Sequence, residues 1–240
     1  MRELQVSREI RVIYEDEDYA VVEKQAGVLT IPDRYKPELF NLYTALNEKY
    51  GKIFIVHRLD KDTSGVIVFA KNAEAHRDLS IKFEKGEARK TYLAVIKGIP
   101  EKESGTIDLP LAPLKNYKNI MSVNYKIGKK SVTTYKILQK YKGYSLAEVK
   151  LLTGRMHQIR AHFRAIGNPL ALDTLYTDKH KQSITSGEIL NTPDNRELIS
   201  RLTLHAAQIQ FESIKNIKLK FGAPLPNDMS LLIQTLQKSA

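Results

Sequence analysis

The chain has 240 residues, a length that suits one large domain or two small ones and is sufficient to bury a hydrophobic core. It contains no cysteine, which excludes disulfides, thiolate nucleophiles and cysteine-bound zinc and favours a reducing compartment such as the cytoplasm. Lysine and arginine outnumber aspartate and glutamate by 38 to 27, and the resulting net charge of +11 favours a polyanionic partner such as nucleic acid.

The chain carries no internal repeat and no Gly/Ser-rich or Pro-rich linker. We therefore predict a single domain over residues 1–240, and we expect it to be a monomer. Its N-terminus mixes charges with short apolar runs and lacks the apolar core of a signal peptide. No apolar run approaches the roughly 18 residues of a membrane-spanning helix. The expected protein is cytoplasmic and does not use a membrane as a partner.

Short segments rich in β-branched and aromatic residues predict strands, because such side chains pack well on a pleated surface. In chain order they are IRVIYEDEDYAVVEK, GKIFIVHRLD, SGVIVFAK and KTYLAVIKG. Two further segments, SVTTYKILQKY and YSLAEVKLLTG, flank the turn residues Lys142-Gly143 and predict a β-hairpin. The sheet is therefore expected to be largely antiparallel.

Helical spacing of apolar residues appears between these strands. One helix is expected before Gly51, and a second is expected to begin after Asn72 and to end at Gly86. A third follows Thr153-Gly154, with a buried stripe of Met156, Ile159, Phe163 and Ile166 and a second face of His157, Arg160 and Arg164. Strands in neighbouring hairpins with interspersed helices predict an α+β fold.

The polar loop HRLDKDTSG, from His57 to Gly65, lies between two apolar runs that would hold it rigidly. One interpretation is a charged turn that satisfies its own backbone. A second is a calcium loop, but its twelfth position is Lys71 instead of the required glutamate, so this interpretation is rejected. A third is a metal-dependent phosphohydrolase that uses Asp60 and Asp62, although no later acidic cluster suits a magnesium site.

The string HRLDKDTSG resembles the catalytic signature of the RluA-type pseudouridine synthases, HRLD followed by two variable residues and TSG. Further motifs that resemble this family follow in the expected order: KTYLAVIKG, TGRMHQIRAHFRAIGNPLALDTLY and RLTLHAAQIQF. The resemblance implies RNA uridine isomerisation, and a mixed, mostly antiparallel sheet with a central cleft. It also implies neither a cofactor nor a metal.

The resemblance implies three catalytic residues. Asp60 corresponds to the aspartate that drives cleavage of the glycosidic bond, by nucleophilic addition or by proton abstraction from the ribose. Tyr92 corresponds to the tyrosine that stacks on the base and assists proton removal at C5. Arg160 corresponds to the arginine that pairs with the aspartate, and a facing guanidinium keeps a carboxylate charged and oriented.

The resemblance also places Arg58 in the RNA around the flipped nucleotide, with Arg155 and His157 as secondary RNA contacts. From Leu114 to Tyr144 the sequence contains eight lysines, five tyrosines and no acidic residue. Lysines attract phosphates and tyrosines can stack on unpaired bases, so this stretch predicts an RNA-binding surface that includes Lys115 and Lys118.

The sequence departs from the family pattern at Asn168, where a histidine is common, and at Leu172, where a glycine is usual. These departures affect the expected turn geometry after the third helix.

Residues 177–200 are polar and predict an exposed insertion. Because the first expected strand begins within the first dozen residues, no N-terminal S4 module is expected. A ribosomal or transfer RNA is the expected partner, with a phosphohydrolase or a non-catalytic RNA-binding protein as alternatives.

Overall fold

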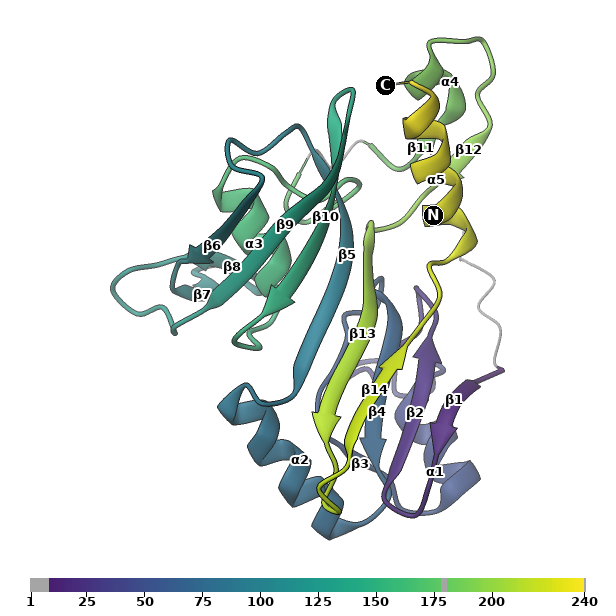
Figure 1. Cartoon of the computed structure of the whole chain (residues 1–240), viewed down its shortest axis with the longest axis vertical. Coiled ribbons are helices and arrows are strands. Elements are labelled where there is room, and N and C mark those ends of the chain that lie inside the picture. Colours follow the sequence, from purple (N-terminus) through teal and green to yellow (C-terminus); the bar gives the residue numbers. More distant parts are fainter. Residues whose placement is uncertain (1–8, 178–180, 240) are drawn as a thin grey trace. The chain divides into compact units, whose positions relative to one another are not determined.

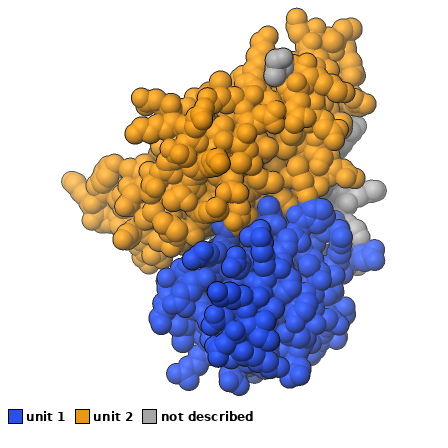
Figure 2. All heavy atoms as spheres, viewed as in Figure 1, with its two compact units in different colours: residues 1–90, 206–224 blue, residues 91–205, 225–240 orange. Residues whose placement is uncertain are grey.

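The computed structural model describes residues 9–177 and 181–239 (Figure 1). The chain folds into two compact units, coloured separately in Figure 2. Unit 1 comprises residues 1–90 and 206–224, and unit 2 comprises residues 91–205 and 225–240. Within the described ranges the fold contains five helices and mostly antiparallel strand pairs, which confirms the predicted α+β class.

The sheet of unit 1 contains the strands that the first two apolar segments and SGVIVFAK predicted. Its strand order is β1-β2-β4-β13, with β3 paired to β4 and β14 paired to β13. Its strands are β1 (Arg11–Glu15), β2 (Tyr19–Lys24), β3 (Phe54–Ile55), β4 (Ser64–Ala70), β13 (Leu204–Glu212) and β14 (Lys218–Gly222). The segment GKIFIVHRLD forms only the two-residue strand β3, so most of it belongs to the loop that precedes β4.

Two helices belong to unit 1, and both begin at an asparagine. They are α1 (Leu42–Tyr50) and α2 (Ala73–Lys85). The side chain of Asn72 accepts the N–H of Ala75 at 2.9 Å, and Gly86 ends α2 in the left-handed conformation with φ 74°. The bounds of α2 confirm the prediction from capping residues.

The core of unit 1 lies where α2 packs against the sheet. Strands β2 and β4 are buried on both faces, and their alternate residues contribute to one apolar cluster with Leu79 of α2 and Phe211 of β13. Strand β4 is buried along its whole length and is therefore rigid. The loop that precedes β4 is anchored at its end by this strand.

Gly65, at the start of β4, has φ +123°, and a Cβ atom there would lie 2.2 Å from the carbonyl oxygen of Ala206. We expect Gly65→Ala to lower the free energy of unfolding by at least about 3 kcal/mol, because backbone would have to move. Gly143→Ala is the control, since Gly143 has φ +75° but no atom within 4 Å of the added Cβ. It should cost about 1 kcal/mol. Urea unfolding measures both, and equal losses would contradict the steric argument.

The sheet of unit 2 has the strand order β5-β10-β9-β6, and its neighbouring strands are antiparallel. These strands are β5 (Arg89–Lys97), β6 (Ser104–Asp108), β9 (Val132–Tyr141) and β10 (Tyr144–Leu151). The turn at Lys142-Gly143 joins β9 to β10, which confirms the predicted hairpin. A second hairpin pairs β7 (Leu111–Leu114) with β8 (Tyr117–Val123).

The rest of unit 2 consists of α3 (Gln158–Ala165), β11 (Ile184–Thr185), α4 (Ser186–Leu190), β12 (Glu197–Ile199) and α5 (Asn227–Lys238). Residues 177–200 are not simply an exposed insertion, and residues 178–180 lie outside the described part. Ile184 and Ile199 are buried in an apolar cluster with Leu232 of α5. The polar composition of this segment concealed the few apolar residues that anchor it.

Leu172 has φ +58°, in the left-handed region that favours glycine. This is the position at which the sequence departs from the glycine expected in the family. The Leu172 side chain is 5% exposed and packs in the cluster around α5. Burial of the leucine side chain therefore offsets the strain of its backbone.

Candidate active site

Asp60 lies in a loop of unit 1 that runs from β3 to β4 and whose backbone is fixed on both sides of the aspartate. Thr30 Oγ1 donates to the carbonyl of Leu59 at 2.9 Å, and the N–H of Gly27 donates to the carbonyl of Lys61 at 2.9 Å. The N–H of Thr63 donates to the carbonyl of Asp60 at 3.1 Å, which closes a tight turn. The loop therefore holds a partly exposed carboxylate on fixed backbone.

Lys24, the last residue of β2, is fully buried. Its ammonium donates to three backbone carbonyls: Gln25 at 3.0 Å, Val28 at 2.6 Å and Lys61 at 2.8 Å. A buried ammonium is stable only when its protons have such acceptors. Lys24 thus links the segment after β2 to the residue beside Asp60, a role that the sequence analysis missed.

His57 begins the HRLD motif and serves the packing of unit 1. The N–H of Val68 donates to His57 Nε2 at 3.3 Å, so in the neutral ring Nδ1 carries the proton. Its ring lies 4.7 Å from that of Phe83, measured between centroids. Burial lowers the pKa of His57 well below 6.5, and the nearby ammonium of Lys90 lowers it further. The imidazole is therefore neutral at physiological pH.

Lys90, which begins the KTY motif, lies beside the same aromatic ring. Its ammonium is 4.9 Å from the centroid of Phe83. The side chain is half-buried by accessible area, but the ammonium is surrounded by protein, and this burial lowers the pKa of Lys90 from 10.5 to about 8. Desolvation acts on the charged ammonium and not on the exposed stem of the side chain.

We expect Lys90→Met to stabilise the chain by about 1–3 kcal/mol at pH 7, because the wild type holds a poorly solvated ammonium there. The folded pKa lies below the unfolded one, so wild-type stability rises with pH between about 8 and 10.5. This contribution should vanish in the variant. Urea unfolding from pH 7 to 10 measures it, with the exposed Lys85→Met as control. A Lys90→Met variant less stable than the wild type at pH 7 would contradict this account.

Tyr92 lies on β5 of unit 2, opposite Val149 of β10. Its side chain is only 5% exposed. Burial limits the motion of the ring, which suits a residue that must hold one face of a base. Stacking on uracil and assistance at C5 remain predictions from the motif.

Arg160, on α3 of unit 2, forms a buried bidentate pair with Asp173. Its Nε and one terminal nitrogen donate to the two carboxylate oxygens at 2.8 and 2.7 Å. The two side chains are 8% and 0% exposed. The guanidinium also lies 5.2 Å from the ring centroid of Tyr176. The motif did not reveal Asp173 as a partner, and the predicted pairing of Arg160 with Asp60, which belongs to unit 1, stays a prediction.

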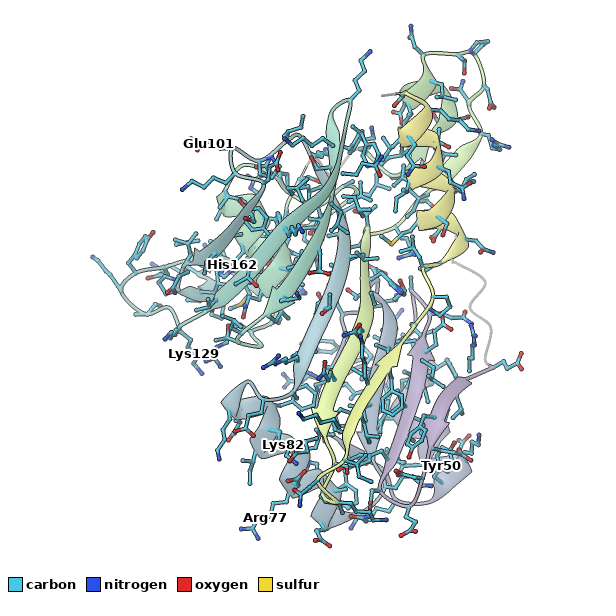
Figure 3. All side chains as sticks on the ribbon, in the orientation of Figure 1. Tyr50, Arg77, Lys82, Glu101, Lys129 and His162 are labelled. Atoms are coloured by element: carbon cyan, nitrogen blue, oxygen red, sulfur yellow. The ribbon has the colours of Figure 1, made fainter. Side chains whose placement is uncertain are left out.

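The helix that carries Arg160 differs from its predicted faces. Ile159 and Phe163 are buried as expected, but Met156 precedes α3 and is 39% exposed. His162 is fully buried and bonds to Thr133 Oγ1 at 2.9 Å and to the Leu109 carbonyl at 3.0 Å (Figure 3). The predicted stripe was wrong at Met156 because the helix begins two residues later.

The residues before α3 form a turn that sets its start. His157 has φ +51°, and its Nδ1 lies 3.3 Å from the hydroxyl of Tyr176. The N–H of Arg155 donates to the buried amide of Gln158, and its guanidinium donates to the carbonyl of Lys130 at 3.2 Å. Arg155 is exposed and His157 is half-buried, so both reach the surface of unit 2.

The basic stretch from Leu114 to Tyr144 is divided between surface and core. Tyr117 and Tyr125 are 56% and 77% exposed, whereas Tyr141 is buried at 3%. Lys115 and Lys129 are exposed, and Figure 3 labels Lys129. The side chain of Lys118 lies outside the described part of the structure. Only some of the predicted tyrosines are therefore available for stacking.

Asp60 and Arg58 belong to unit 1, and Tyr92, Arg155, His157, Arg160 and Lys115 belong to unit 2. Arg58 is exposed beside the buried Leu59.

Over residues 9–177 and 181–239, no group of three or more His, Asp or Glu side chains is placed to hold a metal ion. Such a group is what the phosphohydrolase alternative requires. In the same ranges no helix is both long and apolar enough to cross a membrane.

Comparison with known proteins gives one consistent result. The family model described as RNA pseudouridylate synthase matches residues 18–165. The ribosomal large subunit pseudouridine synthase D of Nitrosomonas europaea is 32% identical over 95% of this chain, which spans 65% of that protein. An uncharacterised RNA pseudouridine synthase of Zymomonas mobilis is 35% identical over 90% of this chain and 94% of its own length. The structure of human RNA pseudouridylate synthase domain containing 4 superimposes with a TM-score of 0.75 at 22% identity, covering 95% of this chain and 93% of the human one.

Proposed function

The chain belongs to the RNA pseudouridylate synthase family, and we propose that it isomerises uridine to pseudouridine in a structured RNA with Asp60 as the catalytic carboxylate. The observation that carries this proposal is the HRLDKDTSG loop. Its backbone is fixed by Lys24, Thr30 and Gly27, and it leaves the Asp60 side chain partly exposed. A carboxylate on such rigid backbone is preorganised for attack on a bound nucleotide.

The reaction breaks the bond between the ribose C1′ and N1 of uracil and forms a bond from C1′ to C5. Asp60 adds to the sugar or removes a ribose proton, the base turns, and the proton on C5 is lost while N1 gains one. The atoms balance without a redox partner, so no cofactor is required. Tyr92 would stack on the freed base and assist removal of the C5 proton, and Arg160 would orient the carboxylate.

RNA would be held by basic side chains from both units. Arg58 lies two residues before Asp60, and Arg155, His157, Lys115 and Lys118 lie on unit 2. Such contacts offset the loss of stacking when a uridine leaves its helix. Because the catalytic motifs are distributed over both units, we infer that the two act together as one catalytic domain.

The name of the Nitrosomonas relative supports ribosomal RNA as the first target to test, ahead of transfer RNA. The cytoplasm is the compartment in which such RNA is modified, and the absence of cysteine suits its reducing conditions. A monomer is sufficient for this function, because the chain itself supplies the candidate aspartate, tyrosine and arginine.

The proposal is tested by carbodiimide-based mapping of pseudouridine in total RNA from cells with and without the gene. One or a few sites should disappear on deletion and return when the chain is expressed again. The purified chain should then modify a transcript that contains those sites, equally well with EDTA present. Transcripts that bind the chain but stay unmodified would favour the non-catalytic RNA-binding alternative, and magnesium-dependent release of phosphate would favour the phosphohydrolase.

A further inference from the structure

A loop over residues 31–40 projects from a fixed base in unit 1. The N–H groups of Leu42 and Tyr43 donate to the carbonyls of Leu29 and Thr30 at 3.0 and 3.1 Å, so the two ends of the loop lie side by side. These bonds close the loop at the entrance to α1. The two ends of the loop are thus held together by backbone hydrogen bonds.

The tip of this loop presents three consecutive exposed residues, Arg34, Tyr35 and Lys36. The N–H groups of Tyr35 and Lys36 donate to Asp33 Oδ1 at 2.8 and 3.0 Å, which turns the Asp33 carboxylate toward the backbone. Tyr35 is 85% exposed, and the Arg34 guanidinium lies 5.8 Å from its ring centroid. An aromatic face next to two cations is therefore open to solvent on an ordered turn.

The base of the loop is bonded directly to the candidate catalytic loop. Thr30, at its first end, donates to the carbonyl of Leu59, the residue before Asp60. The N–H of Gly27, three residues before Thr30, donates to the carbonyl of Lys61, the residue after Asp60, at 2.9 Å. The exposed aromatic and its cations therefore belong to a loop whose base is bonded to both neighbours of Asp60 in the chain.

We propose that Arg34, Tyr35 and Lys36 bind the RNA strand beside the target uridine. Tyr35 stacks on an unpaired neighbouring base, and the two cations contact its phosphates. This inference rests on the proposed function. Stacking and phosphate contact together are how proteins hold single-stranded nucleic acid, and stacking on one aromatic accounts for a large share of that affinity.

The test is fluorescence anisotropy with a fluorescein-labelled oligouridine of twelve nucleotides and the full chain. Tyr35→Ala should weaken binding roughly tenfold or more, whereas Tyr35→Phe keeps the ring and should bind like the wild type. The double variant Arg34→Ala/Lys36→Ala should lower the slope of log Kd against log salt by about 1.4, at about 0.7 per lost single-strand phosphate contact.

Two controls separate RNA contact from general effects. Arg77→Ala removes an exposed arginine from α2 of the same unit (Figure 3), and Glu38→Gln removes an exposed acid from the same loop. Neither should weaken binding. Affinity and salt dependence equal to those of Arg77→Ala in both tip variants would overturn the inference. If Tyr35→Ala weakens binding but the wild type isomerises no RNA, the proposed function fails while this surface stands.

Discussion

Asp60→Ala is expected to reduce pseudouridine formation by roughly 10⁴-fold or more, because the proposed reaction needs a carboxylate at this position of the loop. Asp60→Asn should fail equally, since an amide cannot add to the sugar or accept its proton. RNA affinity should stay within a few fold of the wild type, because basic side chains supply most of it. Single-turnover assays on a transcript with the mapped site measure the rate, and anisotropy measures the affinity.

Asp62→Ala is the matched control for this experiment. Asp62 is exposed on the same loop, and it occupies one of the two variable positions of the motif. Its loss should change the rate less than about threefold. Equal losses at Asp60 and Asp62 would contradict a single catalytic carboxylate and would favour the paired aspartates of the phosphohydrolase alternative.

Asp173→Asn is expected to lower the free energy of unfolding by about 3–5 kcal/mol, because it removes the carboxylate that pairs in two places with the buried Arg160 guanidinium. The pair is bidentate and its two side chains are almost fully buried. Removal of one partner from a buried ion pair lowers the free energy of unfolding by more than the intact pair raises it. Urea unfolding measures the change, and the activity of the folded variant shows whether Asp173 also positions Arg160.

Asp228→Asn provides the comparison for that prediction. Asp228 forms the same two-pronged contact with Arg201, at 2.5 and 2.7 Å, but its side chain is 34% exposed. Arg201 itself is 5% exposed, but water reaches the position of the carboxylate, and the guanidinium keeps its hydrogen bond to the Leu202 carbonyl at 3.1 Å. The expected loss is therefore about 1–2 kcal/mol. If Asp173→Asn lowers the free energy of unfolding by no more than Asp228→Asn does, burial of the aspartate does not determine the loss of stability.

Local signals predicted much of the fold. Asn72 and Gly86 fixed the bounds of α2, because each cap is satisfied by backbone within one turn. The turn residues Lys142-Gly143 likewise identified the hairpin, because a tight turn pairs the strands directly on either side of it. The buried face of α3 was partly mistaken, since periodicity could not show that Arg160 finds Asp173 and becomes buried. That contact depends on a loop that folds back thirteen residues later.

The order of the motifs predicted the residues of the candidate site. It did not predict the contacts that support them. The sequence identifies Asp60, but nothing adjacent to Lys24 indicates that its ammonium reaches Lys61, 37 residues further on. A lysine at the end of a strand that begins with the apolar run YAVV was the available signal. The tyrosines of the basic stretch were overcounted for a similar reason, because strand register decides that Tyr141 points into the core.

Three hydrogen bonds of the Lys24 ammonium go to main-chain carbonyls, a chemical group that all twenty amino acids supply. Residues 25, 28 and 61 can therefore change identity over evolution without loss of these hydrogen bonds, provided that their backbone path is kept. For these three hydrogen bonds, selection on side-chain identity falls on Lys24. A mutagenesis library that randomises the three acceptor positions and retains this lysine should yield many active members, whereas one that randomises Lys24 should yield few.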